Sequence, residues 1–268
     1  MKKIVKVLIP AALLSCAFTT SHAATSDGKS FSVSAGWLHI MPQGKTQGVS
    51  GSLNVTSTPV PINSPTAGFE IKDADTAALL FDYYVNDNVS LELVTGVPPK
   101  MEIDGKGTIL KGISAANAGA GVDLSSLGDI GKVKAYTPAL IGKYQFGTVE
   151  SKFRPFVGAG IMYAHFSGFK LGSNVDSSLN SQVGASQLGL SVNKVKIDDA
   201  VAPVAVIGAD FNINKDWFVT GSVTYAHLKT RAKLDIGSST YGNSEFIQGE
   251  SDIEINPIVT YLGIGYRF

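Results

Sequence analysis

Apolar and polar residues alternate along INPIVTYLGIGYRF, the last stretch of the chain (255–268). The alternate set that ends on Phe268 is bulky and almost entirely apolar, whereas the other set carries an arginine and two glycines. A period of two is the signature of a β-strand whose two faces meet different surroundings. This strand is therefore expected to separate an apolar environment from one with more space and some polarity.

The same alternation recurs upstream, and the connections between segments are short and long in turn. Short turns centre on Asp87, Val149 and Lys215, and long stretches rich in glycine and polar residues cover about 42–73, 98–133, 167–197 and 235–250. An even number of strands with tight turns at one end and long loops at the other is typical of an outer-membrane barrel. The pattern predicts an all-β fold, an eight-stranded antiparallel transmembrane up-and-down β-barrel with long extracellular loops and short periplasmic turns. Its strands are expected at 29–41, 74–85, 89–97, 134–147, 153–166, 200–213, 217–234 and 255–268.

The placement of charge separates this fold from a soluble barrel or sandwich, which would bury its apolar residues and turn its charges to water. Here the bulky alternate sets within 79–85, 89–93, 136–146, 157–163 and 219–225 contain no lysine, arginine, aspartate or glutamate. The charged residues Asp82, Glu92, Lys143, Asp210 and Arg267 all fall on the opposite parity. The bulky faces are therefore predicted to contact outer-membrane lipid, and the charges to face the lumen.

The N-terminus predicts export. Lysines at positions 2, 3 and 6 precede an apolar stretch, and Ser21-His22-Ala23 forms a small-x-small cleavage site, so residues 1–23 are expected to be a cleaved signal peptide and 24–268 the barrel. A retained helical anchor and a lipoprotein cleavage box at Cys16 are the alternatives. Cleavage would remove the single cysteine of the chain and leave no disulfide framework.

Composition limits the partners. The chain has 22 basic and 22 acidic residues, and the resulting zero net charge argues against a nucleic-acid partner. Hydrophobic residues make up 44% of the chain without any long apolar run after the signal peptide, which is how a membrane barrel distributes its hydrophobicity. The sequence does not fix an oligomeric state, and a monomer is expected.

Several strings along the chain resemble the OmpW family in order and spacing. These are FDYYVNDNVSLELVTGVP, KFRPFVGAGIMYAHF, NKDWFVTGSVTYAHLKT and INPIVTYLGIGYRF. The resemblance implies a small barrel with a narrow hydrophobic lumen, closed toward the periplasm, that helps small hydrophobic molecules cross the outer membrane. The terminal aromatics Tyr266 and Phe268 are expected in the interfacial girdle, and they resemble the C-terminal signal that barrels present to their assembly machinery.

The lumen-facing residues divide by height. Six charged residues lie near the predicted periplasmic turns and are expected to meet in a ring of opposite charges: Asp82, Glu92, Lys143, Arg154, Asp210 and Arg267. Such a ring is either a structural salt-bridge network or a plug that stops anything entering from above, and the two interpretations are compatible.

Higher in the lumen the inward parity becomes apolar. The predicted lining is Leu38, Ile40, Val94, Ala139, Ile141, Met162, Val204, Val206, Val259 and Tyr261. An apolar tunnel suits alkyl or aromatic solutes, although an eight-stranded barrel has an interior that side chains alone can fill. Gly96, Pro98 and Pro138 interrupt backbone pairing between the third and fourth strands and are candidates for a lateral opening.

No catalytic residue, metal site or cofactor is expected. His39, His165 and His227 lie on strands that are not neighbours, so they should not converge on a metal. His165-Phe166-Ser167 has the His-x-Ser spacing of lipid A deacylases, but no orienting acid is evident nearby in the sequence. The leading functional hypothesis is a passive channel for small hydrophobic molecules with lateral release into the bilayer. The alternative is a structural or interaction protein whose surface loops act as receptor, adhesin or antigen.

Overall fold

The computed structural model describes residues 25–268 except 46, 55–57, 113–120 and 183–188. The expected signal peptide at 1–23 lies outside the described residues. Among the described residues, no helix is long and apolar enough to cross a membrane.

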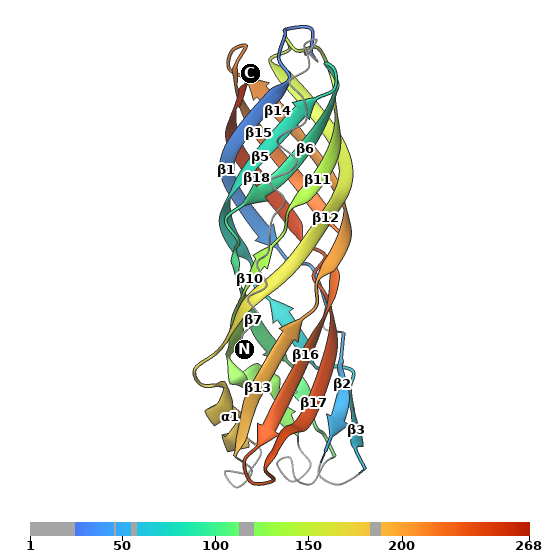
Figure 1. Ribbon diagram of the computed structural model, residues 1–268, viewed down its shortest axis with the longest axis vertical. Coiled ribbons are helices and arrows are strands. Elements are labelled where there is room, and N and C mark those ends of the chain that lie inside the picture. The colour runs from blue at the N-terminus through green and yellow to red at the C-terminus, as the bar shows by residue number, and fades with distance from the viewer. Residues whose placement is uncertain (1–24, 46, 55–57, 113–120, 183–188) are drawn as a thin grey trace, which may run out of the picture.

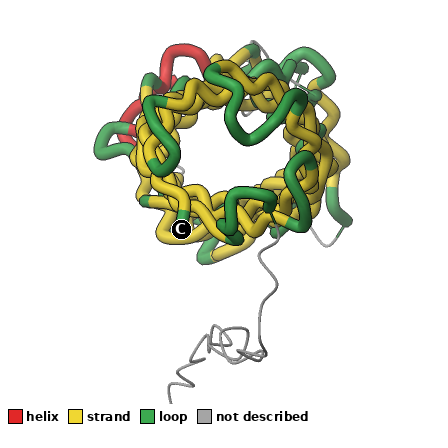
Figure 2. The backbone as a smooth tube through the Cα atoms, turned by 90° about the horizontal axis from the view of Figure 1, so that it is seen from above, coloured by secondary structure: helices red, strands yellow, loops and turns green. Residues whose placement is uncertain are grey.

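Eight antiparallel strands close into a barrel, as the alternation predicted. They are β1 (Phe31–Met41), β5 (Ala74–Tyr84), β6 (Val89–Gly96), β11 (Ala139–Gln145), β12 (Phe153–Leu171), β14 (Ala200–Asn212), β15 (Trp217–Ala226) and β18 (Ile258–Arg267). The order around the wall is β11-β6-β5-β1-β18-β15-β14-β12, and β12 pairs again with β11, so no strand of this ring has a free edge. Figure 2 shows the closed ring along its axis.

The register places the two parities on opposite sides of the wall. In the pairing of β1 with β18, Trp37 lies opposite Leu262 and Leu38 lies opposite Tyr261. Leu262 is 59% exposed on the outside, whereas Tyr261 is 6% exposed inside. A slip of one residue would turn every bulky side chain inward, so the apolar surroundings hold the register.

Beyond one end of the ring, further strands continue the barrel into a long extension (Figure 1). On one side β4 (Gly68–Ile71), β7 (Lys100–Lys106) and β10 (Asp129–Tyr136) join the outer half of β12. On the other side a five-stranded sheet has the order β13 (Leu190–Ile197), β16 (Lys229–Ser238), β17 (Asn243–Glu254), β2 (Val49–Leu53) and β3 (Val60–Ser64). The remaining elements are β8 (Thr108–Ile109), β9 (Val122–Asp123), the 3-10 helix η3 (Leu124–Leu127) and α1 (Val175–Gln182).

The long connections predicted between the ring strands are present, and strands of the extension occupy much of them. Several extension strands pair with segments far away in sequence, as β2 does with β17. Two predicted strands are also divided: 134–147 breaks at Thr137-Pro138, and 217–234 breaks at His227-Leu228. A short alternating segment is stable as a strand only when its partner is in place, and the local pattern does not reveal that partner.

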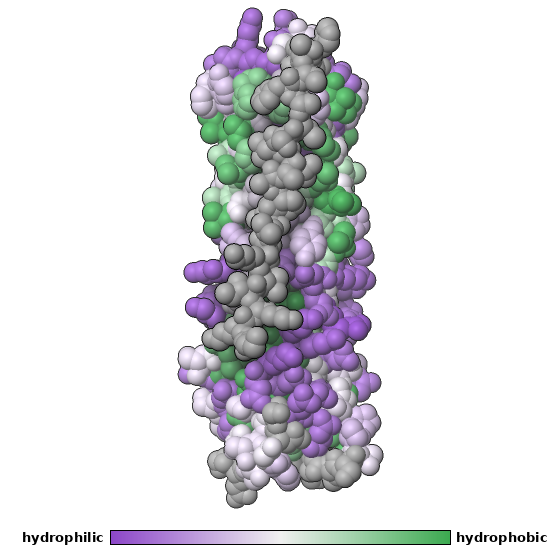
Figure 3. All heavy atoms as spheres, viewed as in Figure 1, coloured by the Kyte–Doolittle hydropathy of each residue, from purple (hydrophilic) through white to green (hydrophobic). Residues whose placement is uncertain are grey.

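The ring and the extension both contain apolar clusters but have different outer surfaces. One buried apolar cluster occupies part of the ring and the adjoining extension, and a second, including Leu124, Ile236 and Phe246, lies in the extension. Hydrophobic residues gather on the outside of the ring, whereas hydrophilic residues gather on the extension (Figure 3). Exposed ion pairs on the extension include Lys106 with Glu70 at 2.8 Å and Lys72 with Asp104 at 3.1 Å. We call the opposite end of the ring, with turns at 85–88, 146–152 and 213–216, the turn end.

Candidate functional site: the barrel interior

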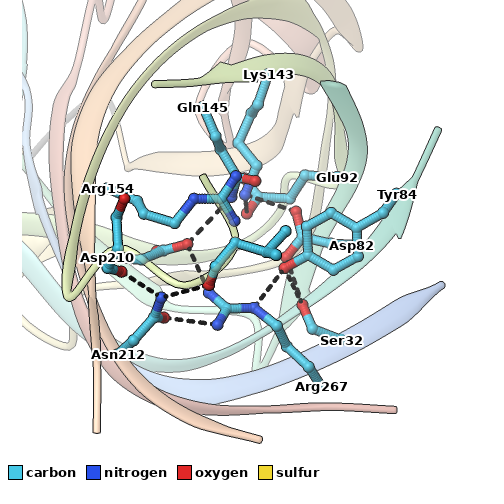
Figure 4. Close-up of polar contacts among 12 residues, drawn as sticks. Ser32, Asp82, Tyr84, Glu92, Lys143, Gln145, Arg154, Asp210, Asn212 and Arg267 are labelled. Atoms are coloured by element: carbon cyan, nitrogen blue, oxygen red, sulfur yellow. Dashed lines mark hydrogen bonds and ion pairs between the residues drawn. The ribbon is translucent and has the colours of Figure 1, made fainter. Parts of the chain in front are cut away.

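A layer of buried charges crosses the ring near its turn end (Figure 4). The Nζ atom of Lys143 on β11 lies 2.6 Å from a carboxylate oxygen of Asp82 on β5 and 2.6 Å from one of Glu92 on β6. Across the lumen, Nη2 of Arg267 on β18 lies 3.3 Å from Oδ2 of Asp210 on β14. All five side chains are buried, and they lie together because each stands on the inward parity of its strand.

Four neutral side chains complete this layer and were not predicted. Arg267 donates from Nη1 to Asn212 at 2.6 Å and from Nε to the Tyr84 hydroxyl at 3.1 Å. Gln145 donates to Asp210 at 3.1 Å, and Ser32 donates to Asp82 at 3.0 Å. The signal for all four is in the sequence, because they share the inward parity with the charges.

Arg154 differs from the other two cations of the layer. It is 1% exposed and donates from Nη2 to the backbone carbonyl of Asp87 in the turn between β5 and β6. Among the described residues no carboxylate lies within ion-pair distance of it, and its Nε has no hydrogen-bond partner. Of the six charges predicted to form a ring, five are in ion pairs: Lys143 with Asp82 and Glu92, and Arg267 with Asp210. The sixth, Arg154, is instead bonded to the turn between β5 and β6.

The charged layer is balanced and tightly packed. The layer contains three cations, Lys143, Arg154 and Arg267, and three carboxylates, Asp82, Glu92 and Asp210. Arg267 stacks over the ring of Phe218 at 4.1 Å, and Phe218 fits only because residue 265 is glycine, since a Cβ there would lie 2.2 Å from the ring. Removing one partner of a buried pair typically costs about 3–5 kcal/mol, so the layer is sensitive to any single loss.

An apolar pocket lies next to the charged layer on the side of the extension. Nine of the ten predicted lining residues border it, and the exception, Val206, is buried in the same apolar cluster without bordering the pocket. The pocket comprises about 870 Å³, counting the part open to solvent. Glu92 touches it from the charged layer, and extension residues such as Met101 and Leu228 border it at the other end. Sequence reasoning missed Met101 because it assigned 98–133 to a loop, and it missed Leu228 although that residue lies within the predicted strand 217–234.

The wall beside this pocket is interrupted between β6 and β11. Their pairing ends at Val94 opposite Ala139, and the next backbone contact along this seam is the Ala135 amide donating to the Pro99 carbonyl at 3.1 Å, beside Lys100 of β7 opposite Lys134 of β10. Between these points the Val97 amide donates to Ala77 on β5 at 2.9 Å, while the Pro138 carbonyl accepts from Tyr163 on β12 at 3.0 Å. No backbone hydrogen bond joins 95–98 to 136–138, all of which the structure describes.

We call this interruption the seam gap (95–98 and 136–138). Pro99 and Thr137 border both the gap and the pocket, and Val97 is 62% exposed on the outside. All three residues predicted to weaken the wall, Gly96, Pro98 and Pro138, lie in the gap, and Gly96 keeps its pairing with Ala78 on the β5 side. Proline has no amide hydrogen, so these positions cannot close the ladder.

A second apolar pocket occupies the extension. It comprises about 810 Å³, counting the part open to solvent, and is bordered by the apolar cores of both sheets, including Ile103, Phe169 and Ile253. β7 places Ile103 at this extension pocket and Met101 at the ring pocket described above, so the two pockets follow each other along the axis. The packed side chains of Val133 and Phe166 lie in the apolar cluster at their junction.

Aromatic side chains encircle both ends of the outer wall. At the turn end Tyr266 packs edge-on against Trp217 at 5.1 Å, and Phe268, 60% exposed, lies 6.1 Å from the ring of Phe31. At the other end Tyr136 on β10 lies 6.0 Å from the ring of His165. This arrangement matches the girdles that flank the lipid-facing band of membrane barrels.

The histidines stand apart from one another, and no cluster of metal ligands occurs among the described residues. The fold brings to His165 an acid that is distant from it in the sequence. Asp199 lies 2.8 Å from His165 Nδ1 and accepts a hydrogen bond from Tyr163 at 2.6 Å, which helps to hold the pKa of Asp199 below its usual range. Within the described contacts, Ser167 is not hydrogen-bonded to His165, so the three residues do not form a relay.

A closed ring of eight strands with an apolar outer belt, aromatic girdles and buried inward charges defines a transmembrane β-barrel of the Gram-negative outer membrane. The OmpW family profile matches residues 26–268, and the chain belongs to the OmpW family, whose barrels are not enzymes.

Known proteins support this assignment along most of the chain. Outer membrane protein W of Vibrio cholerae is 31% identical over 238 residues, which cover 89% of this chain and 88% of that protein. The crystal structure of OprG from Pseudomonas aeruginosa superposes with a TM-score of 0.67 at 22% identity, covering 90% of this chain and 96% of that one, and so shares the fold. The dibenzothiophene metabolism operon protein PahQ of Pseudomonas aeruginosa is 25% identical over 197 residues, 73% of each chain.

Proposed function

We propose that this barrel is a passive channel that takes up small hydrophobic molecules and releases them sideways into the outer membrane. The observation that carries the proposal is the apolar pocket, which has the charged layer at one end and the seam gap beside it. A water-filled porin would have a polar lumen at this height. An apolar lining favours alkyl or aromatic solutes instead.

The two pockets supply a route without an energy source. A solute would enter through the extension pocket and pass to the ring pocket. The charged layer would block the way to the periplasm, because an apolar solute would have to displace paired buried charges. Transfer of each methylene out of water is favourable by about 0.8 kcal/mol, so partition into the bilayer would draw the solute through the seam gap.

The relationship to PahQ supports an aromatic or aliphatic cargo. The name of that relative associates it with an operon for the metabolism of dibenzothiophene, an apolar aromatic molecule. We infer the same class of small hydrophobic compound for this chain, and the pocket contains no charged side chain other than Glu92 at its lower edge that would select an ionic solute.

The decisive experiment compares uptake of a labelled alkane and a labelled aromatic by cells that produce the parent or a variant. An aspartate at Ile141, which is 2% exposed and borders the pocket, should reduce uptake severely because it places an unpaired charge in the path. Ile141→Leu keeps the volume apolar and should transport normally. Heat-modifiable migration of each barrel would show that the variants are folded.

Two further variants test the route without burying a charge, so that a loss of uptake cannot be attributed to misfolding around an unpaired charge. Ala139→Phe adds bulk to the same pocket without burying a charge and should also slow uptake. Thr137→Trp should slow it by narrowing the seam gap. If folded Ile141→Asp and Ala139→Phe cells take up both compounds like the parent, the apolar interior is core packing only. The protein would then be better explained as a surface interaction protein.

Neutralising Lys143 and Glu92 together tests the role of the charged layer. This double change removes one cation and one carboxylate that are 2.6 Å apart, so it keeps the net charge of the layer. We expect an ionic leak in planar bilayers with no gain in hydrophobic uptake. A gain in hydrophobic uptake without leak would show that solute leaves through the turn end instead of the seam gap.

A further inference from the structure

Four lysines share one outer face of the extension. Lys100 on β7, Lys132 and Lys134 on β10, and Lys170 on β12 are all exposed, and they border a single surface groove. Gly168 also borders the groove and is exposed, so no side chain covers the backbone at that point.

The strand register brings these lysines together in opposed pairs. Lys134 is the direct partner of Lys100 in the pairing of β10 with β7, and Lys132 is the direct partner of Lys170 in the pairing of β10 with β12. Like charges directly opposite each other on one face of a sheet are destabilising. The fold therefore bears an electrostatic cost at this face unless an anion offsets it.

Carboxylates of the chain offset only part of this charge. Lys132 contacts Glu102 and lies 4.0 Å from Asp129. Among the described residues, Lys100, Lys134 and Lys170 have no carboxylate within 4.0 Å. Several other cations of the extension are paired, as Lys196 is with Asp198 at 2.9 Å and Arg231 with Asp252 at 2.7 Å, whereas Lys194 and Lys233 have no carboxylate within 4.0 Å among the described residues.

The height of the face on the barrel indicates the kind of anion. Lys134 stands two residues beyond Tyr136, whose ring neighbours His165 in the outer aromatic girdle. At a strand rise of about 3.3 Å per residue, the lysine lies roughly 7 Å along the strand from the girdle, where the head groups of membrane lipids begin. Exposed apolar side chains such as Leu140 lie on the other side of the girdle, where the acyl chains of such a lipid would run.

We propose that Lys100, Lys134 and Lys170, with Lys132 at the edge, bind the phosphate group of a phosphorylated glycolipid of the outer leaflet, of the lipid A type. Lysine ammonium groups form charge-assisted hydrogen bonds with phosphate oxygens, and clusters of lysines near a membrane surface attract anionic lipids. The bound lipid would seat the barrel at a fixed depth and cover the wall beside the seam gap, because Lys100 follows Pro99 directly at the top of that gap.

The test uses the whole barrel in phosphatidylcholine vesicles with increasing amounts of lipid A, in EDTA so that divalent cations do not bridge phosphate to carboxylates. Binding is read from fluorescently labelled lipid A and from lipid A that co-purifies with the barrel. Replacing all three lysines, Lys100→Gln, Lys134→Gln and Lys170→Gln, should weaken binding roughly fivefold per lysine, on the order of 100-fold together. Replacing the three by arginine should keep most of the affinity.

A matched control removes the same number of positive charges from the same extension. The triple variant Lys196→Gln, Lys229→Gln and Arg231→Gln changes cations that the structure pairs with carboxylates, and it should retain lipid A binding. Equal weakening by the two triple variants would mean general surface charge and would overturn the site, as would no weakening by the first. Lys134→Gln alone, expected to lose about fivefold, serves if the triple variant does not fold.

Two further arms identify the source of the phosphate. Lipid A from which the phosphates have been removed should not bind above the phosphatidylcholine background. Millimolar inorganic phosphate should not displace labelled lipid A, because a free ion lacks the acyl chains that hold the lipid beside Tyr136. If inorganic phosphate competes as well as the lipid does, the face is a site for a soluble anion and the lipid assignment is wrong.

Discussion

The single strand β12 belongs to two regions that distribute charge in opposite ways. Within the ring its outward residues are apolar, with Val157 at 44% and Ile161 at 60% exposed, while Arg154 is buried inside. Beyond the girdle residue His165 its exposed residues include Lys170, while Phe166 is buried inside. Charge therefore moves from the interior to the exterior along one continuous strand.

This contrast shows that the two faces of the wall change character at different heights. The outer face changes where the lipid ends, because an unpaired charge in hydrocarbon is expensive and one in water is not. The inner face changes deep inside the ring, between Lys143 and Ile141 on β11, where the outer face is still apolar at Leu140 and Tyr144. The membrane thus determines where the outer face of the wall becomes polar, whereas the position of the charges on the inner face is independent of the lipid boundary.

The largest expected effect comes from breaking the interior charge of the ring. Lys143→Met would leave Asp82 and Glu92 facing each other without their shared cation, at a cost of about 3–5 kcal/mol in the free energy of unfolding. Urea unfolding in lipid vesicles measures this loss. The control is Lys106→Met, which removes an exposed ion pair of the extension and should leave the unfolding free energy unchanged within error. Similar losses in both variants would abolish the distinction between the regions.

A reciprocal exchange on β12 tests the outer faces. Ile161→Arg puts a charge near the middle of the lipid-facing band and should cost about 2–4 kcal/mol. Lys170→Ile, made on the same strand beyond the girdle, should not reduce stability in phosphatidylcholine vesicles. Both values come from the same unfolding titration. A small loss for Ile161→Arg would place that residue outside the hydrocarbon and would shift the boundary drawn here.

The smallest effect on stability is expected at the chain end. Phe268→Lys places a charge at the girdle of the turn end, where the cost falls to about 0–1 kcal/mol. We nevertheless expect much less heat-modifiable barrel in the outer membrane, because Tyr266 and Phe268 form the proposed signal for the assembly machinery. Phe268→Tyr keeps an aromatic end and should assemble normally. If Phe268→Lys barrels reach normal levels in the outer membrane, Phe268 is not part of an assembly signal and serves only as an interfacial anchor.

The sequence by itself determined the ring. Alternation in segments such as 255–268, with the charges of the central strand segments on one parity, determined the strand count and the direction of each face, because a wall between lipid and lumen allows only one parity to be apolar and uncharged. The same parity identified the members of the charged layer. The neutral partners Tyr84, Gln145 and Asn212 were accessible from the same rule, but neutral polar residues give a weaker signal than charges.

Only the tertiary structure revealed the extension, the seam gap and the outer face that carries Lys100, Lys132, Lys134 and Lys170. β2 becomes a strand because β17, nearly 200 residues further on, lies beside it (Ile247 pairs with Leu53), and no local pattern specifies a partner at that distance. The seam gap exists because β6 and β11 end their pairing before β7 and β10 begin theirs. The meeting of Lys100, Lys134 and Lys170 depends on the register between three strands, which cross-strand packing sets and sequence spacing does not.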